Sequence, residues 1–209
     1  MRVRSRAEWM ARPPKSRRAM HPANVTHLFL HHAAATYPSG DEAMRRIQRF
    51  HQDTRGWADY AYNFGVWDDG SIWEGRGWGA QGGHTRGWNT KSVAICYMGD
   101  GSRPVPQAAL DAILWLAADA DRHFGRRLAR QGHRDVGATS CPGDWLYGWW
   151  CDAKDAPAPL RAPQVPSGVP IPEKPEVSAD ANSARPSPIP DLRAGWQAYR
   201  RRMGWLRPR

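Results

Sequence analysis

The apolar residues of the chain form two short, nearly continuous runs, at residues 25–30 and 92–98. Runs of this length without polar alternation are typical of strands buried on both faces of a sheet. The first run ends in adjacent histidines, His31 and His32. We therefore expect two central strands, the first of which delivers these imidazoles at its carboxyl end, where ligand sites of open α/β sheets collect.

Between these runs, residues 60–67 and 71–73 flank Asp68-Asp69-Gly70, a turn signal that predicts a hairpin. Apolar residues recur at helical spacing from Ser39 to about residue 54, and again from Pro106 to residue 124. A short strand at 127–131 and a short helix at 144–150 complete the pattern. The alternation of strands and helices predicts an α/β fold.

The pattern changes after residue 152. Residues 153–190 are rich in proline and lack apolar periodicity, which predicts an extended linker. Residues 191–209 carry six arginines, and their apolar side chains recur at helical spacing, which indicates a basic amphipathic helix. We accordingly expect a folded domain at residues 1–152, with a basic lead-in at 1–20, followed by the linker and the helix.

The formal net charge of +10 is concentrated at the two ends. Residues 1–20 hold seven basic residues and one acid, residues 191–209 hold six and one, and the rest has 17 basic and 18 acidic residues. A nearly neutral body argues against nucleic-acid binding, which gathers Lys and Arg on one face of the fold. The sequence shows neither a membrane span nor a secretory signal. We expect a monomer made in the (host) cytoplasm.

Candidate chemistry lies at residues 132–143, Gly-His-Arg-Asp-Val-Gly-Ala-Thr-Ser-Cys-Pro-Gly, where His133 and Cys141 stand eight positions apart. Catalytic zinc uses three protein ligands and leaves a position for water. His31 supplies a third ligand, although any single histidine could instead be a solvated or core residue. The set predicts a zinc hydrolase, because zinc lowers the pKa of bound water towards about 7 and polarises a carbonyl.

The chain resembles the zinc-dependent N-acetylmuramoyl-L-alanine amidases and the peptidoglycan recognition proteins built on the same domain. The motifs, between about residues 5 and 150, are Ser-Arg-Ala-Glu-Trp, Phe-Leu-His-His-Ala, Phe-His-Gln-Asp-Thr-Arg-Gly-Trp, Tyr-Asn-Phe, Asp-Gly-Ser-Ile-Trp-Glu-Gly-Arg-Gly-Trp, Gly-His-Thr and the loop at 132–143. The resemblance implies one catalytic domain with a mixed central β-sheet flanked by helices, and Zn²⁺ held by His31, His133 and Cys141. Members that only bind peptidoglycan typically lose one of these ligands.

The resemblance also implies catalytic roles for Tyr62 and Thr139. Tyr62 matches a tyrosine that lies beside the zinc-bound water. Its phenol can orient that water or stabilise the tetrahedral oxyanion. Thr139 stands where some phage members carry a lysine, and its hydroxyl can donate a hydrogen bond but brings no charge.

Seven residues match positions that contact the muramyl peptide in this family: His32, Gly56, Trp57, Trp78, Gln81, His84 and Asn89. Among them, Gly56-Trp57 resembles the pair of members that prefer meso-diaminopimelate over lysine in the peptide stem. An arginine often accompanies this pair, and Gln81 stands at that position here. The resemblance thus favours a diaminopimelate stem only in part.

The implied reaction is hydrolysis of the amide between N-acetylmuramic acid and L-alanine in peptidoglycan. We expect a phage endolysin that degrades the bacterial cell wall; the alternatives are a non-catalytic recognition module, a bacterial autolysin and a muropeptide-recycling amidase. For residues 191–209 two hypotheses stand side by side. In the first, the helix contacts the anionic envelope of the bacterium. In the second, it has no envelope role and either docks on the catalytic domain or is solvated.

Overall fold

The structure is a computed structural model that describes residues 1–154 of the 209-residue chain. The predicted linker and the C-terminal helix with its envelope contact lie outside the described residues, so the division into domain, linker and helix stays a prediction. Within residues 1–154, no helix is long and apolar enough to span a membrane.

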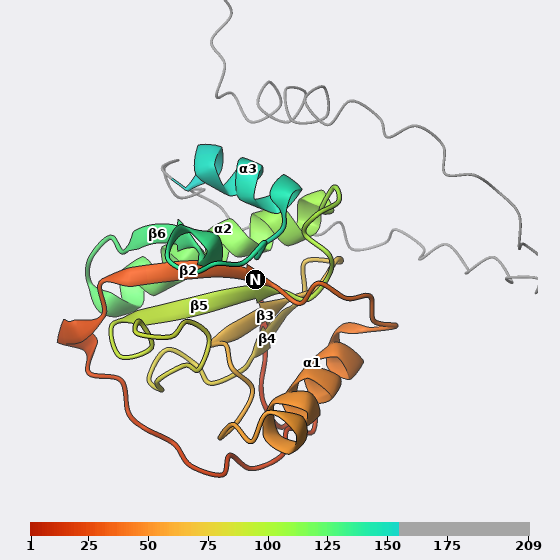
Figure 1. Cartoon of the computed structure of the whole chain (residues 1–209), viewed down its shortest axis with the longest axis vertical. Helices are drawn as coiled ribbons and strands as arrows, with labels where there is room; N and C mark the ends of the chain where they lie inside the picture. Colours follow the sequence, from red (N-terminus) through yellow and green to blue (C-terminus); the bar gives the residue numbers. More distant parts are fainter. Residues whose placement is uncertain (155–209) are drawn as a thin grey trace, which may run out of the picture. The chain divides into compact units, whose positions relative to one another are not determined.

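Six strands form one sheet in the order β1-β4-β3-β5-β2-β6 (Figure 1). Their bounds are Val3–Arg4 (β1), His27–His32 (β2), Phe64–Val66 (β3), Ile72–Glu74 (β4), Ser92–Tyr97 (β5) and Ala129–Gly132 (β6). β3 and β4 pair antiparallel, whereas all other neighbours pair parallel. The predicted mixed α/β sheet is therefore confirmed, with the two apolar runs as adjacent central strands.

Register within the sheet decides what β2 delivers. His31 lies opposite Cys96 on β5, and Leu30 lies opposite Ile95. Successive side chains of a strand point to opposite faces. His31 therefore shares a face with Cys96, while Leu30 and His32 belong to the other face.

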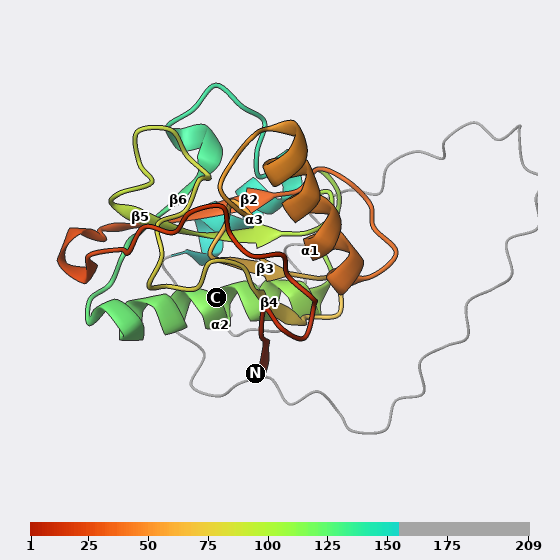
Figure 2. The ribbon, with the colours of Figure 1, turned by 90° about the horizontal axis from the view of Figure 1, so that it is seen from below.

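Helices cover both faces of the sheet. They are α1 (Gly40–Arg49), which continues into the π-helical turn η2 (Phe50–Thr54), α2 (Gln107–Phe124) and α3 (Asp144–Ala153). Two short 3-10 helices, η1 (Pro22–Asn24) and η3 (His133–Asp135), complete the described secondary structure. Figure 2 shows α2 along one face and α1 on the opposite face, and Figure 1 shows α3 beside β6.

Local chemistry explains where α1 begins and where α2 ends. The Ser39 side chain accepts a hydrogen bond from the Glu42 N–H and caps α1. α2 ends at Gly125, whose φ of 64° is easily adopted only by glycine. On the α1 side of the sheet, Met44 packs with Trp9, Tyr60 and other buried residues into one apolar cluster. Both helices thus form where the periodicity predicts them.

The first strand of the predicted hairpin is shorter than expected, because residues 61–63 form bends and β3 begins at Phe64. Asn63 holds these bends in place. Its side-chain amide donates to the Gly77 and Ala80 carbonyls, and its Oδ1 accepts from the Ala94 N–H. Tyr62 consequently lies on a fixed loop, with its ring centroid 5.0 Å from that of His31.

His51 ties η2 to the same loop. Its Nδ1 accepts a hydrogen bond from the Ala61 N–H at 3.1 Å, and its ring stacks on Trp57. Burial, together with the charge of Arg76, lowers the pKa of His51 to about 4. The folded protein therefore holds this imidazole neutral at neutral pH, where its Nδ1 lone pair is available to Ala61.

This histidine should make the fold sensitive to acid. The unfolded chain binds a proton at His51 near pH 6.5, whereas the folded chain binds one only near pH 4, so stability is full above pH 6.5 and falls as the pH decreases to about 4. The loss from this group should be about 3 kcal/mol. We expect His51→Asn, whose Oδ1 can still accept from Ala61, to abolish that part of the decline. Urea unfolding of both proteins between pH 7 and pH 4, with chelator present, measures the difference.

His21→Asn is the matched control, because His21 is exposed. It should leave the pH dependence of the unfolding free energy unchanged. Parallel declines of wild type and His51→Asn would contradict the prediction.

Candidate metal centre

Three side chains converge where β2 ends and the loop after β6 begins. One ligand atom from each of His31, His133 and Cys141 lies within 4.8 Å of the other two. The two imidazole centroids are 4.6 Å apart, and Nδ1 of His31 is 3.5 Å from Sγ of Cys141. His31 and Cys141 are buried, while His133 is half-buried. Among residues 1–154 this is the group of His, Cys, Asp and Glu side chains that could hold a metal.

The loop that carries His133 and Cys141 is closed by hydrogen bonds across its base. The Arg134 N–H donates to the Cys141 carbonyl at 3.0 Å. The Arg134 guanidinium donates to the Ser140 carbonyl and pairs with Asp144 at 2.8 Å. These bonds bring two residues eight positions apart onto the same side of the loop, so the metal-binding geometry is built by Arg134 as well as by the ligands.

The far end of the loop packs directly on backbone. Gly143 has a φ of 92°, and a Cβ there would lie 2.2 Å from the carbonyl carbon of Gly101. Any other residue would therefore meet both an unfavourable backbone conformation and a clash. Glycine at this position lets the loop approach the turn after β5 and keeps Cys141 next to β2.

The electrostatics of the three side chains suit a divalent cation. Burial lowers the pKa of His31 well below its usual value, with a further contribution from neighbouring histidines, and burial also lowers the pKa of His133. Both imidazoles thus offer lone pairs at neutral pH. Burial raises the pKa of Cys141 to about 11, while a hydrogen bond from the His32 N–H, at 3.4 Å, and the charge of Arg134 lower it. A cation would favour the thiolate, and two nitrogens with one sulfur form a donor set that fits zinc.

Both residues predicted to be catalytic lie beside this set. Burial raises the pKa of Tyr62 well above its usual value, as do the Cys96 and Cys141 thiols, so the phenol keeps its proton and is a hydrogen-bond donor. The Thr139 hydroxyl accepts a hydrogen bond from the Cys141 N–H at 3.1 Å. Thr139 is exposed and helps to orient the cysteine.

Two of the predicted substrate contacts, His84 and Asn89, adjoin the same centre. The His84 ring lies 5.2 Å from the His31 ring. The Oδ1 atom of Asn89 accepts from the backbone N–H groups of His84 and Thr85 at 2.9 and 3.0 Å, which fixes the turn that carries them. Gly56 is exposed, with a φ of 70°. The adjacent Trp57 is 42% exposed, and its ring stacks on the imidazole of His51.

The structure does not bring His32 and Trp78 to the centre. His32 follows His31 in the strand, so its side chain belongs to the other face, where Nδ1 accepts from the Gly101 N–H at 3.0 Å. Trp78, which we expected to contact the muramyl peptide, is buried against Phe64 and donates from Nε1 to Asp119 on α2. It packs on the sheet face covered by α2, opposite to His31.

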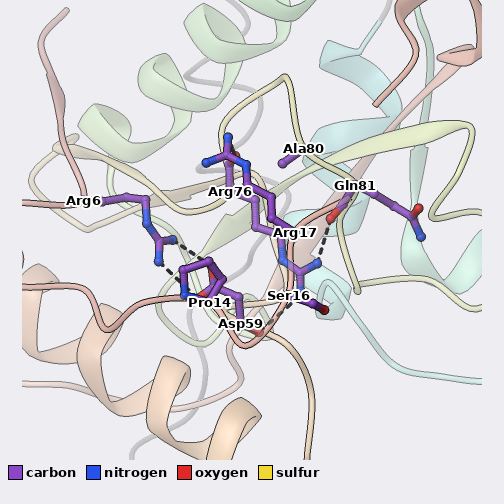
Figure 3. A pocket seen from close by; sticks show the side chains of 8 residues that line it. All are labelled: Arg6, Pro14, Ser16, Arg17, Asp59, Arg76, Ala80 and Gln81. Carbon is purple, nitrogen blue, oxygen red and sulfur yellow. Dashed lines mark hydrogen bonds and ion pairs between the residues drawn. The ribbon is translucent and has the colours of Figure 1, made fainter. Parts of the chain in front are cut away.

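At Gln81, the structure shows an arginine that the sequence motifs had not singled out. The Arg76 guanidinium donates to the Gln81 carbonyl at 2.7 Å and to the Tyr60 carbonyl at 2.6 Å. Arg76 and Gln81 line the pocket in Figure 3, together with Arg6, Arg17 and other residues. Although Gln81 itself has no charge, a guanidinium therefore lies next to it. The position of Arg76 within Glu-Gly-Arg-Gly-Trp was the available signal.

Comparison with known proteins agrees with this geometry. Residues 21–144 match the Amidase_2 family model, described as N-acetylmuramoyl-L-alanine amidase. Peptidoglycan recognition protein 1 of Mus musculus is 38% identical over 151 residues, which cover 68% of this chain and 82% of the relative. The N-acetylmuramoyl-L-alanine amidase of Homo sapiens is 35% identical over 155 residues, 69% of this chain and 27% of that protein.

A solved structure extends the comparison to a ligand complex. Peptidoglycan recognition protein-LE in complex with tracheal cytotoxin (monomeric diaminopimelic acid-type peptidoglycan) is 30% identical, with a TM-score of 0.66 over 70% of this chain and 90% of that chain. The described chain therefore shares its fold as well as its motifs with these proteins. It belongs to the Amidase_2 family, which includes relatives named peptidoglycan-recognition proteins and N-acetylmuramoyl-L-alanine amidases.

Proposed function

We propose that this protein is a zinc-dependent N-acetylmuramoyl-L-alanine amidase that hydrolyses the amide bond between N-acetylmuramic acid and L-alanine in peptidoglycan. The observation that carries the proposal is the convergence of His31, His133 and Cys141, with ligand atoms within 4.8 Å of one another. A non-catalytic recognition module is the alternative. A complete set of three ligands favours the enzyme, because recognition alone does not require it.

The chain's own groups have separate roles in this reaction. His31, His133 and Cys141 would hold zinc, which when bound lowers the pKa of a water molecule and polarises the scissile carbonyl. Tyr62 is a half-buried, protonated phenol beside His31, and it would donate a hydrogen bond to the oxygen on which negative charge develops. Thr139 would keep the Cys141 backbone in place.

We further propose a preference for stems that contain diaminopimelate. Diaminopimelic acid-type peptidoglycan is the ligand named for the recognition protein-LE complex. In the present chain, Trp57 offers an exposed ring, and Arg76 lies close enough to the adjacent His51 to lower its pKa. The positive charge of Arg76, near the imidazole on which Trp57 stacks, would attract the additional carboxylate of such a stem.

The biological setting that we propose is degradation of the intact bacterial cell wall, as by a phage endolysin. Support comes from charge, since residues 1–20 hold seven basic residues and one acid. A cationic segment favours a large anionic wall over small soluble fragments. A recycling amidase, in contrast, would act on released muropeptides.

Mass spectrometry of digested sacculi tests the reaction directly. We expect cleavage to release stem peptides that begin with L-alanine and to leave the lactyl carboxyl on the glycan, without cleavage between sugars. Cleavage of a glycosidic or cross-bridge bond would contradict the amidase. Parallel digestion of soluble muropeptides tests the setting: faster turnover of fragments than of sacculi would exclude the endolysin role while leaving the reaction intact.

A further inference from the structure

A hydrogen-bonded chain of three side chains connects the metal centre to a residue outside the ligand set. Oγ1 of Thr85 lies 3.3 Å from Nε2 of His31 and 2.9 Å from Nδ1 of His84. Thr85 and His84 are 3% and 8% exposed, so water does not compete freely for these bonds. The single hydroxyl of Thr85 therefore bridges two buried imidazoles.

The two outer ring nitrogens of this chain are the ones left for other partners. Nδ1 of His31 faces Sγ of Cys141 at 3.5 Å, which makes it the nitrogen that would bind a metal. Nε2 of His84 is buried and has no hydrogen-bond partner among the described residues. A buried ring nitrogen without a partner is energetically unfavourable, so a ligand oxygen that reached it would be stabilised there.

The two hydrogen bonds that link His31, Thr85 and His84 can run from donor to acceptor in either of two directions. A hydroxyl has one hydrogen, and a neutral imidazole has one N–H and one lone pair. In the first direction, His31 donates to Thr85 and Thr85 donates to His84, which leaves the His84 hydrogen on Nε2. In the second direction, His84 donates to Thr85 and Thr85 donates to His31, so the outer nitrogen of His84 carries a lone pair and Nδ1 of His31 carries the hydrogen.

We propose that Thr85 is a positioning residue that couples metal binding at His31 to the hydrogen-bond polarity of His84. A metal on Nδ1 of His31 requires its lone pair, which leaves the His31 hydrogen on Nε2, where it is donated to Thr85. The hydroxyl hydrogen of Thr85 then has an acceptor among these side chains only if Nδ1 of His84 carries a lone pair, which is the first direction. His84 then presents an N–H to the ligand, which selects an acceptor such as a carbonyl or carboxylate oxygen of the muropeptide. The inference rests on the proposed function, since it assumes that the centre binds zinc.

Zinc affinity, measured by competition with a chromogenic chelator, tests the first half of the proposal. Thr85→Val keeps the shape of the side chain but leaves the His31 N–H without an acceptor, so zinc should bind about 10- to 100-fold more weakly. Thr85→Ser retains the hydroxyl and should restore binding to within a few-fold of wild type. Equal zinc affinities of wild type and Thr85→Val would overturn the proposal. Failure of the wild type to bind zinc would instead contradict the proposed function.

Nitrogen-15 NMR of the histidine rings tests the second half in the wild-type protein and so does not depend on the folding of a variant. In zinc-loaded protein, the His84 hydrogen should be on Nε2. The same spectrum of Thr85→Ser should agree, whereas Thr85→Val should lose this single tautomer. A hydrogen on Nδ1 of His84 in zinc-loaded wild type would overturn the inference, even where zinc binds tightly.

Discussion

Replacement of Cys141 by alanine is expected to abolish peptidoglycan hydrolysis, with a fall in kcat/KM of at least about 10³-fold. Metal ions supply several kcal/mol of transition-state stabilisation, and each 1.36 kcal/mol corresponds to a factor of ten. Cys141 provides the sulfur of the three-atom cluster, and its pKa of about 11 shows that the site stabilises a thiolate only poorly without a cation. The release of stem peptides with a free L-alanine amino group from purified sacculi measures kcat/KM, and the zinc bound per protein is determined on the same samples.

Binding to peptidoglycan should survive this change. Trp57, His84 and Asn89 lie in segments that do not depend on Cys141 for their backbone hydrogen bonds. We expect co-sedimentation of the alanine variant with sacculi to weaken by less than about tenfold, which corresponds to about 1.4 kcal/mol. Cys151→Ala is the matched control, because this half-buried cysteine lies on α3 and outside the ligand set. Undiminished hydrolysis by metal-free protein would exclude the zinc mechanism.

Tyr62→Phe should lower kcat by about 10²- to 10³-fold, the range seen when one donor to a developing oxyanion is removed. The phenylalanine keeps the ring contact with His31, at 5.0 Å, and the packing against neighbouring tyrosines. Only the hydroxyl is lost. Because that donor acts on charge formed in the transition state, KM and zinc content should stay close to wild type.

Tyr60→Phe offers the matched control for this experiment. Burial raises the pKa of Tyr60 as it does that of Tyr62, but Tyr60 is fully buried within the apolar cluster with Trp9 and Met98, whereas Tyr62 is half-buried at its edge. The Cys96 thiol raises the pKa of both tyrosines, whereas the Cys141 thiol contributes only to that of Tyr62. We expect a change in kcat of less than about threefold. An equal decrease in the two variants would show that Tyr62 acts only through packing.

Much of the fold could be predicted because its signals are local. The runs at 25–30 and 92–98 became β2 and β5, since only a strand buried on both faces accepts so many consecutive apolar side chains. Ser39 and Gly125 mark helix ends through their own backbone chemistry. The hairpin strand at residues 60–67 was overestimated, because the Asn63 side chain competes with the sheet for backbone groups.

The candidate metal set was also accessible from residue types and order. His133 and Cys141 lie on one Gly- and Pro-rich loop, His31 ends an apolar run, and two imidazoles with one thiolate form a zinc donor set. The structure brings these three side chains together, with ligand atoms within 4.8 Å of one another. The supporting groups were different: the spacing of Thr85 does not distinguish it from other polar residues of a glycine-rich loop, and Arg76 was marked only by its place in Glu-Gly-Arg-Gly-Trp.

The sequence by itself determined which residues are candidates for the chemistry and the order in which the chain presents them. The tertiary structure alone decided which side each of them faces: His32 turned away from His31, Trp78 went to the core under α2, and Arg76 came to lie at Gln81. The physical reason is that adjacent strand residues point to opposite faces. Contacts between loops distant in sequence depend on how the whole sheet closes, as the bond between Thr85 and His31, 54 positions apart, shows most directly.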